Sequence, residues 1–243
     1  MNISASQIIG DLVAMDYRTA AVFKANGIDF CCNGNRSIAE ACTEAKLSTP
    51  TLLQQLQEVI EAPGQESHHF QTWPPTLLAD YIEQVHHAYV RRKISEIIPY
   101  LNKITAVHGN NHPELKAVQQ LFEESSEDLQ EHMHKEETIL FPFIRDANKP
   151  GDNGPTGATI SNDRDASPIA MIHEEHDKEG ERFRKIASLT NNYTTPPDGC
   201  NTYRVTLGLL REFEEDLHLH IHLENNILIP KILESGKEGN KTI

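Results

Sequence analysis

The sequence has few cysteines, and they do not form the pattern of a disulfide framework. Only four of its 243 residues are cysteines, and Cys31 and Cys32 are adjacent. Neighbouring cysteines are poorly placed for an ordinary structural disulfide. We therefore expect reduced thiols.

Long apolar runs are also missing. No segment approaches ~18 consecutive apolar residues, and the N-terminus has no basic stretch followed by an apolar run. These absences predict a cytoplasmic protein with no membrane partner.

Positive charge is the third feature in short supply. The chain has 22 Lys and Arg residues against 36 Asp and Glu residues, which gives a formal net charge of −14 at pH 7. Such a balance argues against binding nucleic acid or an anionic membrane through general electrostatics. With 13 histidines and a single tryptophan, the excess lies in side chains that can bind metals.

What the sequence does contain is a repeated segment. Residues 128–144, DLQEHMHKEETILFPFI, return 88 positions later as residues 216–232, DLHLHIHLENNILIPKI. Each copy contains H-x-x-x-E: His132 with Glu136, and His220 with Glu224. Four residues make about one helical turn, so each pair presents a nitrogen and a carboxylate on one helix face. The two copies predict two metals.

Helical periodicity predicts an all-α protein: a four-helix bundle at residues 76–235, preceded by a small helical module at residues 1–62. In the module, Ser6 is expected to cap a first helix, and a later helix should start at Thr49 with Pro50 in its first turn. Residues 61–75 contain four of the prolines and glycines and mark the boundary. Within the bundle, a polar run at 147–167 should form a long loop before a helix that begins at Ser167 and Pro168.

Two further histidines lie on apolar faces of the other two bundle helices. His87 precedes His132 by 45 residues, and His176 precedes His220 by 44. An antiparallel bundle with these intervals would bring all six side chains to one level of its interior. The residues expected on the apolar face with His132 and Glu136 are Val118, Leu121, Phe122, Leu129, Ile139 and Phe143.

These six polar residues are better explained by metals than by packing. A single histidine on an apolar face is most often a hydrogen-bonded core residue, but six buried polar groups all need partners. Zinc normally closes its shell at four ligands, whereas carboxylates that can bridge suit a pair of iron or manganese ions. We predict two non-haem irons with two histidines each, bridged by Glu136 and Glu224, with room for an oxide or hydroxide and a small ligand.

Neighbouring acids and histidines are assigned by their helical positions. Asp128 and Glu175 are candidates for orienting the ligand imidazoles or for lining an access path, although solvent-facing acids are an equally good interpretation. His134 and His222 each follow a ligand histidine by two residues, a rotation of about 200° around the helix. We therefore expect both to face solvent.

The segments IDFCCNG, EEHDKEGE, HKEETILFP and HLENNILIP resemble the hemerythrin-like family, and within it the "repair of iron centres" proteins of the YtfE and ScdA type. The resemblance spans nearly the whole chain and places the family's ligands on the same six residues. It implies a factor that repairs iron–sulfur clusters damaged by oxidative or nitrosative stress, through iron release. Iron–sulfur proteins would then be its clients, and a homodimer through the N-terminal module is implied.

Two other functions stay open. The same ligands would serve an enzyme that reduces nitric oxide, although a repair and delivery factor is favoured over an enzyme. An oxygen-binding or sensing protein is less favoured, because classical hemerythrins use a fifth histidine that has no matching motif here. Cys31 and Cys32 could be inert, a redox pair or docking thiols, and the resemblance favours a functional role for them.

Overall fold

The structure is a computed structural model that describes residues 3–63, 70–147 and 168–238. Its regular elements in these ranges are helices, apart from one isolated bridge between Ile8 and Ser37, so the predicted all-α class is confirmed. No helix in these ranges is both long and apolar enough to cross a membrane. The chain divides into two compact units: unit 1 joins residues 1–78 with 221–243, and unit 2 comprises residues 79–220.

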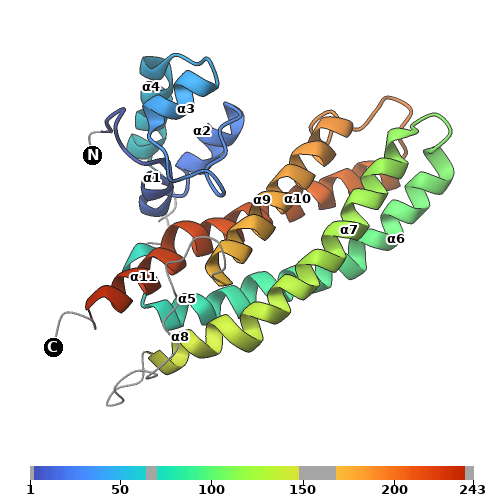
Figure 1. The fold of residues 1–243 in the computed structure, drawn as a ribbon. Helices are drawn as coiled ribbons and strands as arrows, with labels where there is room; N and C mark the ends of the chain where they lie inside the picture. Colours follow the sequence, from blue (N-terminus) through green and yellow to red (C-terminus); the bar gives the residue numbers. More distant parts are fainter. Residues whose placement is uncertain (1–2, 64–69, 148–167, 239–243) are drawn as a thin grey trace. The chain divides into compact units, whose positions relative to one another are not determined.

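Unit 2 is built on four long helices, as the periodicity predicts (Figure 1). They are α6 (Ala88–His108), α7 (Glu114–Lys135), α9 (Pro168–Leu189) and α10 (Asn201–Leu223), the last of which ends three residues beyond the unit. Helix α7 packs against both α6 and α9. At the centre, Phe122, Phe183 and Phe213 from three helices pack with ring centroids 5.2–6.5 Å apart. The predicted polar run at 147–167 and the Ser167 cap lie outside the described residues, except Ala147, which ends a helix.

Turns of π-helix extend three of these helical runs. They are η2 (Ile82–His87), which follows α5 (Pro75–Tyr81); η3 (Glu136–Leu140), which leads into α8 (Phe141–Ala147); and η4 (Glu224–Leu228), which follows α10. A π turn accommodates an extra residue and so rotates the positions that follow it. The prediction that Ile139 lies in the core is therefore wrong: it is 63% exposed, whereas Leu140 and Phe141 are buried.

A pair of substitutions tests this register. Leu140→Ala should destabilise the fold by about 2–5 kcal/mol, because it leaves a cavity in a packed interior. Ile139→Ala should change the free energy of unfolding by no more than about 0.5 kcal/mol, since its side chain already contacts solvent. Denaturant unfolding of both variants measures the difference, and an equal loss would contradict the π turn.

Unit 1 contains the N-terminal helices and the C-terminal end of the chain. Its elements are α1 (Ile9–Met15), α2 (Thr19–Ala25), α3 (Ile38–Glu44), α4 (Thr49–Glu61), η1 (Phe70–Thr72), η4 and α11 (Ile229–Glu238). Pro50 lies in the first turn of α4, as predicted. The expected Ser6 cap is wrong, because α1 begins after Ile8, whose backbone bridges to Ser37 instead.

A close approach of backbones joins α1 to the loop before α3 and to η4, all within unit 1. The amide of Gly10 donates to the carbonyl of Gly34 at 2.8 Å. A Cβ on Gly34 would lie 2.4 Å from the Phe30 carbonyl oxygen, and one on Gly10 would lie 2.5 Å from Oδ1 of Asn226. Only glycine fits at residue 34, where the contact is with backbone, whereas a side chain at residue 10 would have to displace the amide of Asn226.

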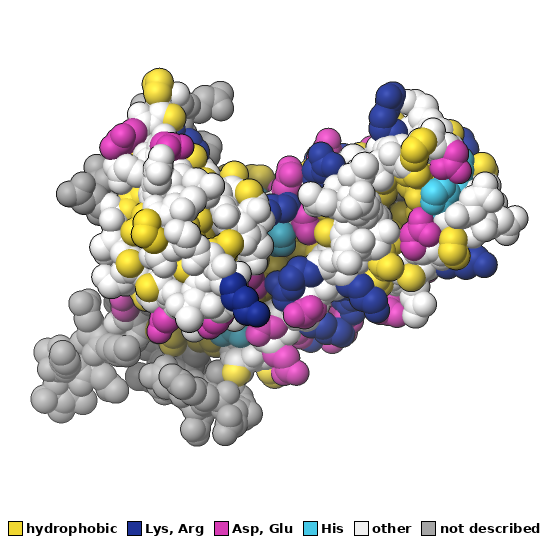
Figure 2. All heavy atoms as spheres, turned by 90° about the horizontal axis from the view of Figure 1, so that it is seen from above, with side chains coloured by type: hydrophobic (Ala, Val, Ile, Leu, Met, Phe, Trp, Pro, Cys, Tyr) yellow, Lys and Arg dark blue, Asp and Glu magenta, His cyan; other side chains and the backbone are white. Residues whose placement is uncertain are grey.

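Charged side chains of both signs are interspersed on the face drawn in Figure 2. Within unit 2, for example, Asp128 accepts from Lys178 and from Arg182, each at 2.7 Å. Some acidic side chains are thus paired locally, while the net charge of the chain stays at −14.

Candidate metal centre

All six residues predicted as ligands are buried. These residues are at most 3% exposed, which is rare for charged or ionisable groups unless they have partners. The residues and their elements are His87 at the end of η2, His132 in α7, Glu136 at the start of η3, His176 in α9, His220 in α10 and Glu224 at the start of η4.

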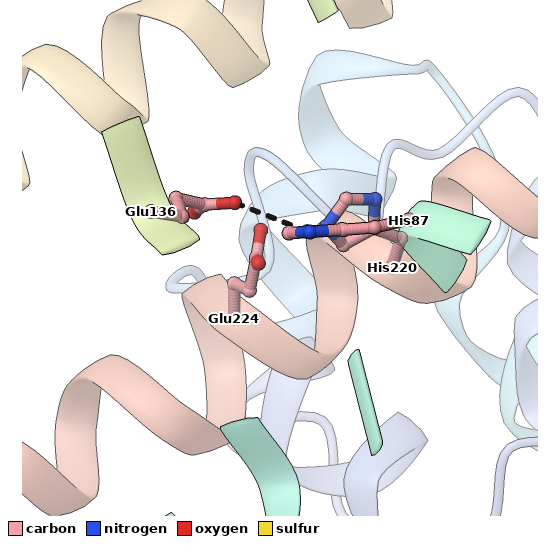
Figure 3. Close-up of side chains that lie close together, drawn as sticks. All are labelled: His87, Glu136, His220 and Glu224. Carbon is pink, nitrogen blue, oxygen red and sulfur yellow. Dashed lines mark ion pairs between the residues drawn. The ribbon is translucent and has the colours of Figure 1, made fainter. Parts of the chain in front are cut away.

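Their donor atoms form two groups that share both carboxylates. One group is His87, Glu136, His220 and Glu224, and the other is His132, Glu136, His176 and Glu224. Within each group the donor atoms lie within 4.8 Å of one another. His220 and Glu224 are one turn apart in the continuous helical run of α10 and η4, and Figure 3 shows the first group converging. Imidazole nitrogens with carboxylates are a donor set that fits iron, manganese or zinc, and the sharing suits a dimetal centre.

Glu136 lies between the two groups. Its Oε2 atom is 3.3 Å from Nε2 of His87, the contact dashed in Figure 3, and 3.3 Å from Nε2 of His132. The Nε2 atoms of His132 and His176 are 3.1 Å apart. One carboxylate oxygen thus faces an imidazole of each group.

Both shared carboxylates occupy the first position of a π turn. Glu136 begins η3, and Glu224, the corresponding residue 88 positions later, begins η4. Such bulges occur frequently at functional sites, where the altered register redirects side chains. No amino-acid motif in the sequence predicts these bulges. Both nevertheless begin at the same position of the repeat.

Glu175 holds the imidazole of His132. Its Oε2 atom lies 2.7 Å from Nδ1 of His132, and Lys135 donates to its other oxygen at 2.8 Å. The hydrogen bond with His132, helped by Lys135, lowers the pKa of Glu175 to about 2 despite partial desolvation. A carboxylate can only accept, so Nδ1 carries the proton and Nε2 presents its lone pair to the centre.

Glu137 holds His87 in the same way, and sequence reasoning missed it. Its Oε1 atom lies 2.7 Å from Nδ1 of His87, and Arg91 donates to both of its oxygens at 2.8 Å. Its position directly after Glu136 mirrors that of Glu175 directly before His176. The position of Glu137 next to a predicted ligand could therefore have identified it as a partner of a ligand imidazole.

Asp128, the other acid proposed for orienting an imidazole, contacts Lys178 and Arg182 instead. His86, the residue directly before His87, is buried but belongs to neither group. Its Nδ1 atom lies 3.1 Å from Oδ1 of Asp216, and its ring stacks on His220 with centroids 5.7 Å apart.

A small pocket in unit 2 reaches the second group. Its volume is about 90 Å³, and His132 and His176 line it. The rest of its wall is Asp128, Leu129, Glu131, Lys135, Glu175, Lys178 and Glu179. Pockets that enclose drug-sized molecules have ~300–1,000 Å³. This one admits a small ligand or an ion.

The two histidines expected to face solvent differ. His134 is exposed as predicted, but the prediction for His222 is wrong because it is 1% exposed. Within unit 1, its ring packs against Tyr17 and Phe30 with centroids 5.9 and 6.0 Å away. Burial lowers the pKa of His222 to about 3, so it is neutral in the folded chain.

Substitution of Glu175 tests its orienting role. Glu175→Gln should weaken metal binding at the His132 and His176 group about 10–100-fold, the usual effect of losing such a partner. Asp128→Asn is the matched control, because Asp128 lines the same pocket without contacting an imidazole. Competition with a coloured chelator measures both affinities, and equal losses would show that Glu175 acts only through the charge of the pocket.

The sequence matches two known domains. Residues 5–60 match ScdA_N, a domain of unknown function, and residues 78–232 match the hemerythrin HHE cation binding domain. Full-length relatives include the iron-sulfur cluster repair protein YtfE of Cronobacter sakazakii, which is 30% identical over 95% of this chain and 98% of its own length. The iron-sulfur cluster repair protein ScdA of Staphylococcus haemolyticus is 30% identical over 94% of this chain and 99% of its own.

Proposed function

Because this chain belongs to the hemerythrin HHE cation-binding family and to its iron–sulfur cluster repair branch, we propose that its dimetal centre holds two non-haem irons and that this iron is used to repair iron–sulfur clusters. The observation that carries the proposal is the pair of buried groups that share Glu136 and Glu224. Each iron would have two histidines, and both carboxylates would bridge. An oxide or hydroxide and a small exogenous ligand would complete the shells.

When bound, the dimetal centre would provide ferrous iron for release. It would also provide open coordination positions for a small ligand such as nitric oxide or dioxygen. The chain's own residues set the conditions for that exchange. Glu175 and Glu137 keep two ligand imidazoles in the tautomer that binds metal. The pocket beside His132 and His176 would give an ion a path to or from solvent, lined by four carboxylates and two lysines.

The size of the pocket favours small reactants. At about 90 Å³ it cannot receive a cluster or a peptide, so an iron–sulfur client would meet released iron outside it. This supports iron delivery to iron–sulfur proteins as partners. It also supports the second candidate function, the reduction of nitric oxide, because a diatomic ligand would fit the same pocket. A homodimer through the N-terminal module remains a proposal from the resemblance.

One pair of incubations separates the two candidates. The diferrous protein is mixed anaerobically with an apo iron–sulfur enzyme and, separately, with nitric oxide. Recovery of the client cluster matched by loss of iron from the protein supports delivery. Catalytic formation of nitrous oxide with full retention of iron supports the enzyme instead.

A matched pair of variants ties either result to the dimetal centre. His132→Ala should abolish the activity, because His132 is a member of the second group. His134→Ala should preserve it, since that side chain is exposed. Loss of activity in both variants would show that the effect arises from helix α7 as a whole and would count against the proposed centre.

A further inference from the structure

A third cluster of metal-capable side chains lies in unit 1, in the loop between α2 and α3. Donor atoms of Asp29, Cys31 and Cys32 all lie within 4.8 Å of one another. The two Sγ atoms are 3.7 Å apart, although adjacent residues in an extended chain point to opposite sides. The chain bends at residues 31–33, and this brings both thiols to one side.

The carboxylate of Asp29 is fixed against the two thiols. Its Oδ1 atom accepts the backbone N–H groups of Cys31 at 3.1 Å and Cys32 at 3.0 Å, and it lies 3.4 Å from Sγ of Cys31. Its Oδ2 atom accepts from the side chain of Asn33 at 2.9 Å. The three donors are thus held together by the fold before any ion binds.

The loop is also anchored from η4. Asn226 donates to the carbonyls of Phe30 and Cys31 at 3.3 and 3.2 Å, and Asn225 donates to the Cys31 carbonyl at 3.2 Å. Three side-chain hydrogen bonds from η4 thus hold the backbone of the loop at residues 30 and 31. Such rigidity favours a preformed ligand geometry.

The cluster places three groups close together that are all negative when deprotonated: the carboxylate and the two thiols. Two thiolates beside a carboxylate would repel one another in this half-buried place. A cation between them removes that conflict, since a coordinated thiol is deprotonated by the metal.

We propose that Asp29, Cys31 and Cys32 bind a thiophilic divalent cation, with Zn²⁺ as the best match. Two thiolates bound at about 2.3 Å to a tetrahedral ion lie about 3.8 Å apart, whereas a linear two-coordinate ion would separate them by about 4.6 Å. The observed 3.7 Å fits the tetrahedral ion.

The chain leaves this proposed site open on one side. Asp29, Cys31 and Cys32 supply three ligands, and a tetrahedral ion takes a fourth from water or from another molecule. Cys31 is buried while Cys32 is half-exposed, so the ion would be reached from the Cys32 side. On binding, each thiol forms a sulfur–metal bond and its proton passes to solvent.

Cobalt substitution in the full-length chain tests the site. Co²⁺ bound to thiolate absorbs in the near ultraviolet through sulfur-to-metal charge transfer, whereas Co²⁺ bound only to histidine and carboxylate does not. The parent protein carries Cys200→Ser, because Cys200 is an exposed thiol that could bind cobalt on its own. We expect the band in the parent, its loss in Cys31→Ser and Cys32→Ser, and its displacement by Zn²⁺, which binds such ligands more tightly.

Two further variants locate the ion. Asp29→Asn keeps an acceptor for the backbone N–H groups but removes the charge, and it should weaken cobalt binding about tenfold or more. His132→Ala should keep the band, which separates this site from the dimetal centre. Absence of the band in the parent, or its persistence in both cysteine variants, would overturn the proposal. Melting curves verify folding, and the half-exposed position of Cys32 makes Cys32→Ser the milder variant.

Discussion

Replacing Glu136 by alanine should remove both metals from the chain. The unsubstituted chain, with its two His/Glu groups, should hold about two metals. The reason is geometric. The carboxylate belongs to both groups, and its Oε2 atom lies 3.3 Å from Nε2 of His87 and of His132. Metal content per folded chain, measured by mass spectrometry after iron loading, gives the result.

Two other variants set the scale for that experiment. His176→Ala removes a member of the second group alone and should leave the metal of the first group in place. His134→Ala removes an exposed side chain and should leave both metals. If Glu136→Ala still retained one tightly bound metal, the carboxylate would not be shared between the two ions.

The placement of the six buried residues followed from spacing in the chain. An H-x-x-x-E pair spans one helical turn, and a turn is a local property that neighbouring helices do not alter. The prediction that His87 lies on the apolar face was right for the same reason: Val90, Ile94, Ile97 and Leu101 are buried with it. Local periodicity therefore predicted which residues point inward.

Periodicity failed where the backbone departs from it. Ile139 was assigned to the core on the assumption of 3.6 residues per turn, but η3 inserts an extra residue after Glu136. The side chain is consequently exposed, and Leu140 occupies the interior. A π turn costs helix energy and is maintained by packing around it, which the local pattern does not encode.

Contacts between segments that are distant in the chain could not be predicted from the sequence either. His134 and His222 have the same offset in the two copies of the repeat, yet one is exposed and the other is buried against Tyr17 and Phe30. The partnership of His87 with Glu137 likewise joins residues 50 positions apart. Helical spacing gives the direction of a side chain from its own helix. It does not give what lies there.

Removing the metals should lower the melting temperature by about 8–16 °C. A ligand at 1,000 times its Kd stabilises a fold by about 4.1 kcal/mol, and each kcal/mol is about 2–4 °C for a chain of this length. The six donor residues are at most 3% exposed, so without ions their desolvation is poorly compensated. Anaerobic melting curves with and without a chelator at pH 7.5 measure the shift.

Glu136→Gln makes that measurement specific to the centre. The amide has nearly the same volume as the carboxylate but lacks its charge, so no cavity forms and a buried negative charge is removed. The metal-free variant should melt at the same temperature as the metal-free parent or higher, and adding iron should change it little. A large iron-dependent shift in the variant would mean that the stabilising ions bind elsewhere. Equal melting temperatures for the parent with and without iron would mean that its buried carboxylates and imidazoles satisfy one another, and the dimetal centre would then have no role in the fold.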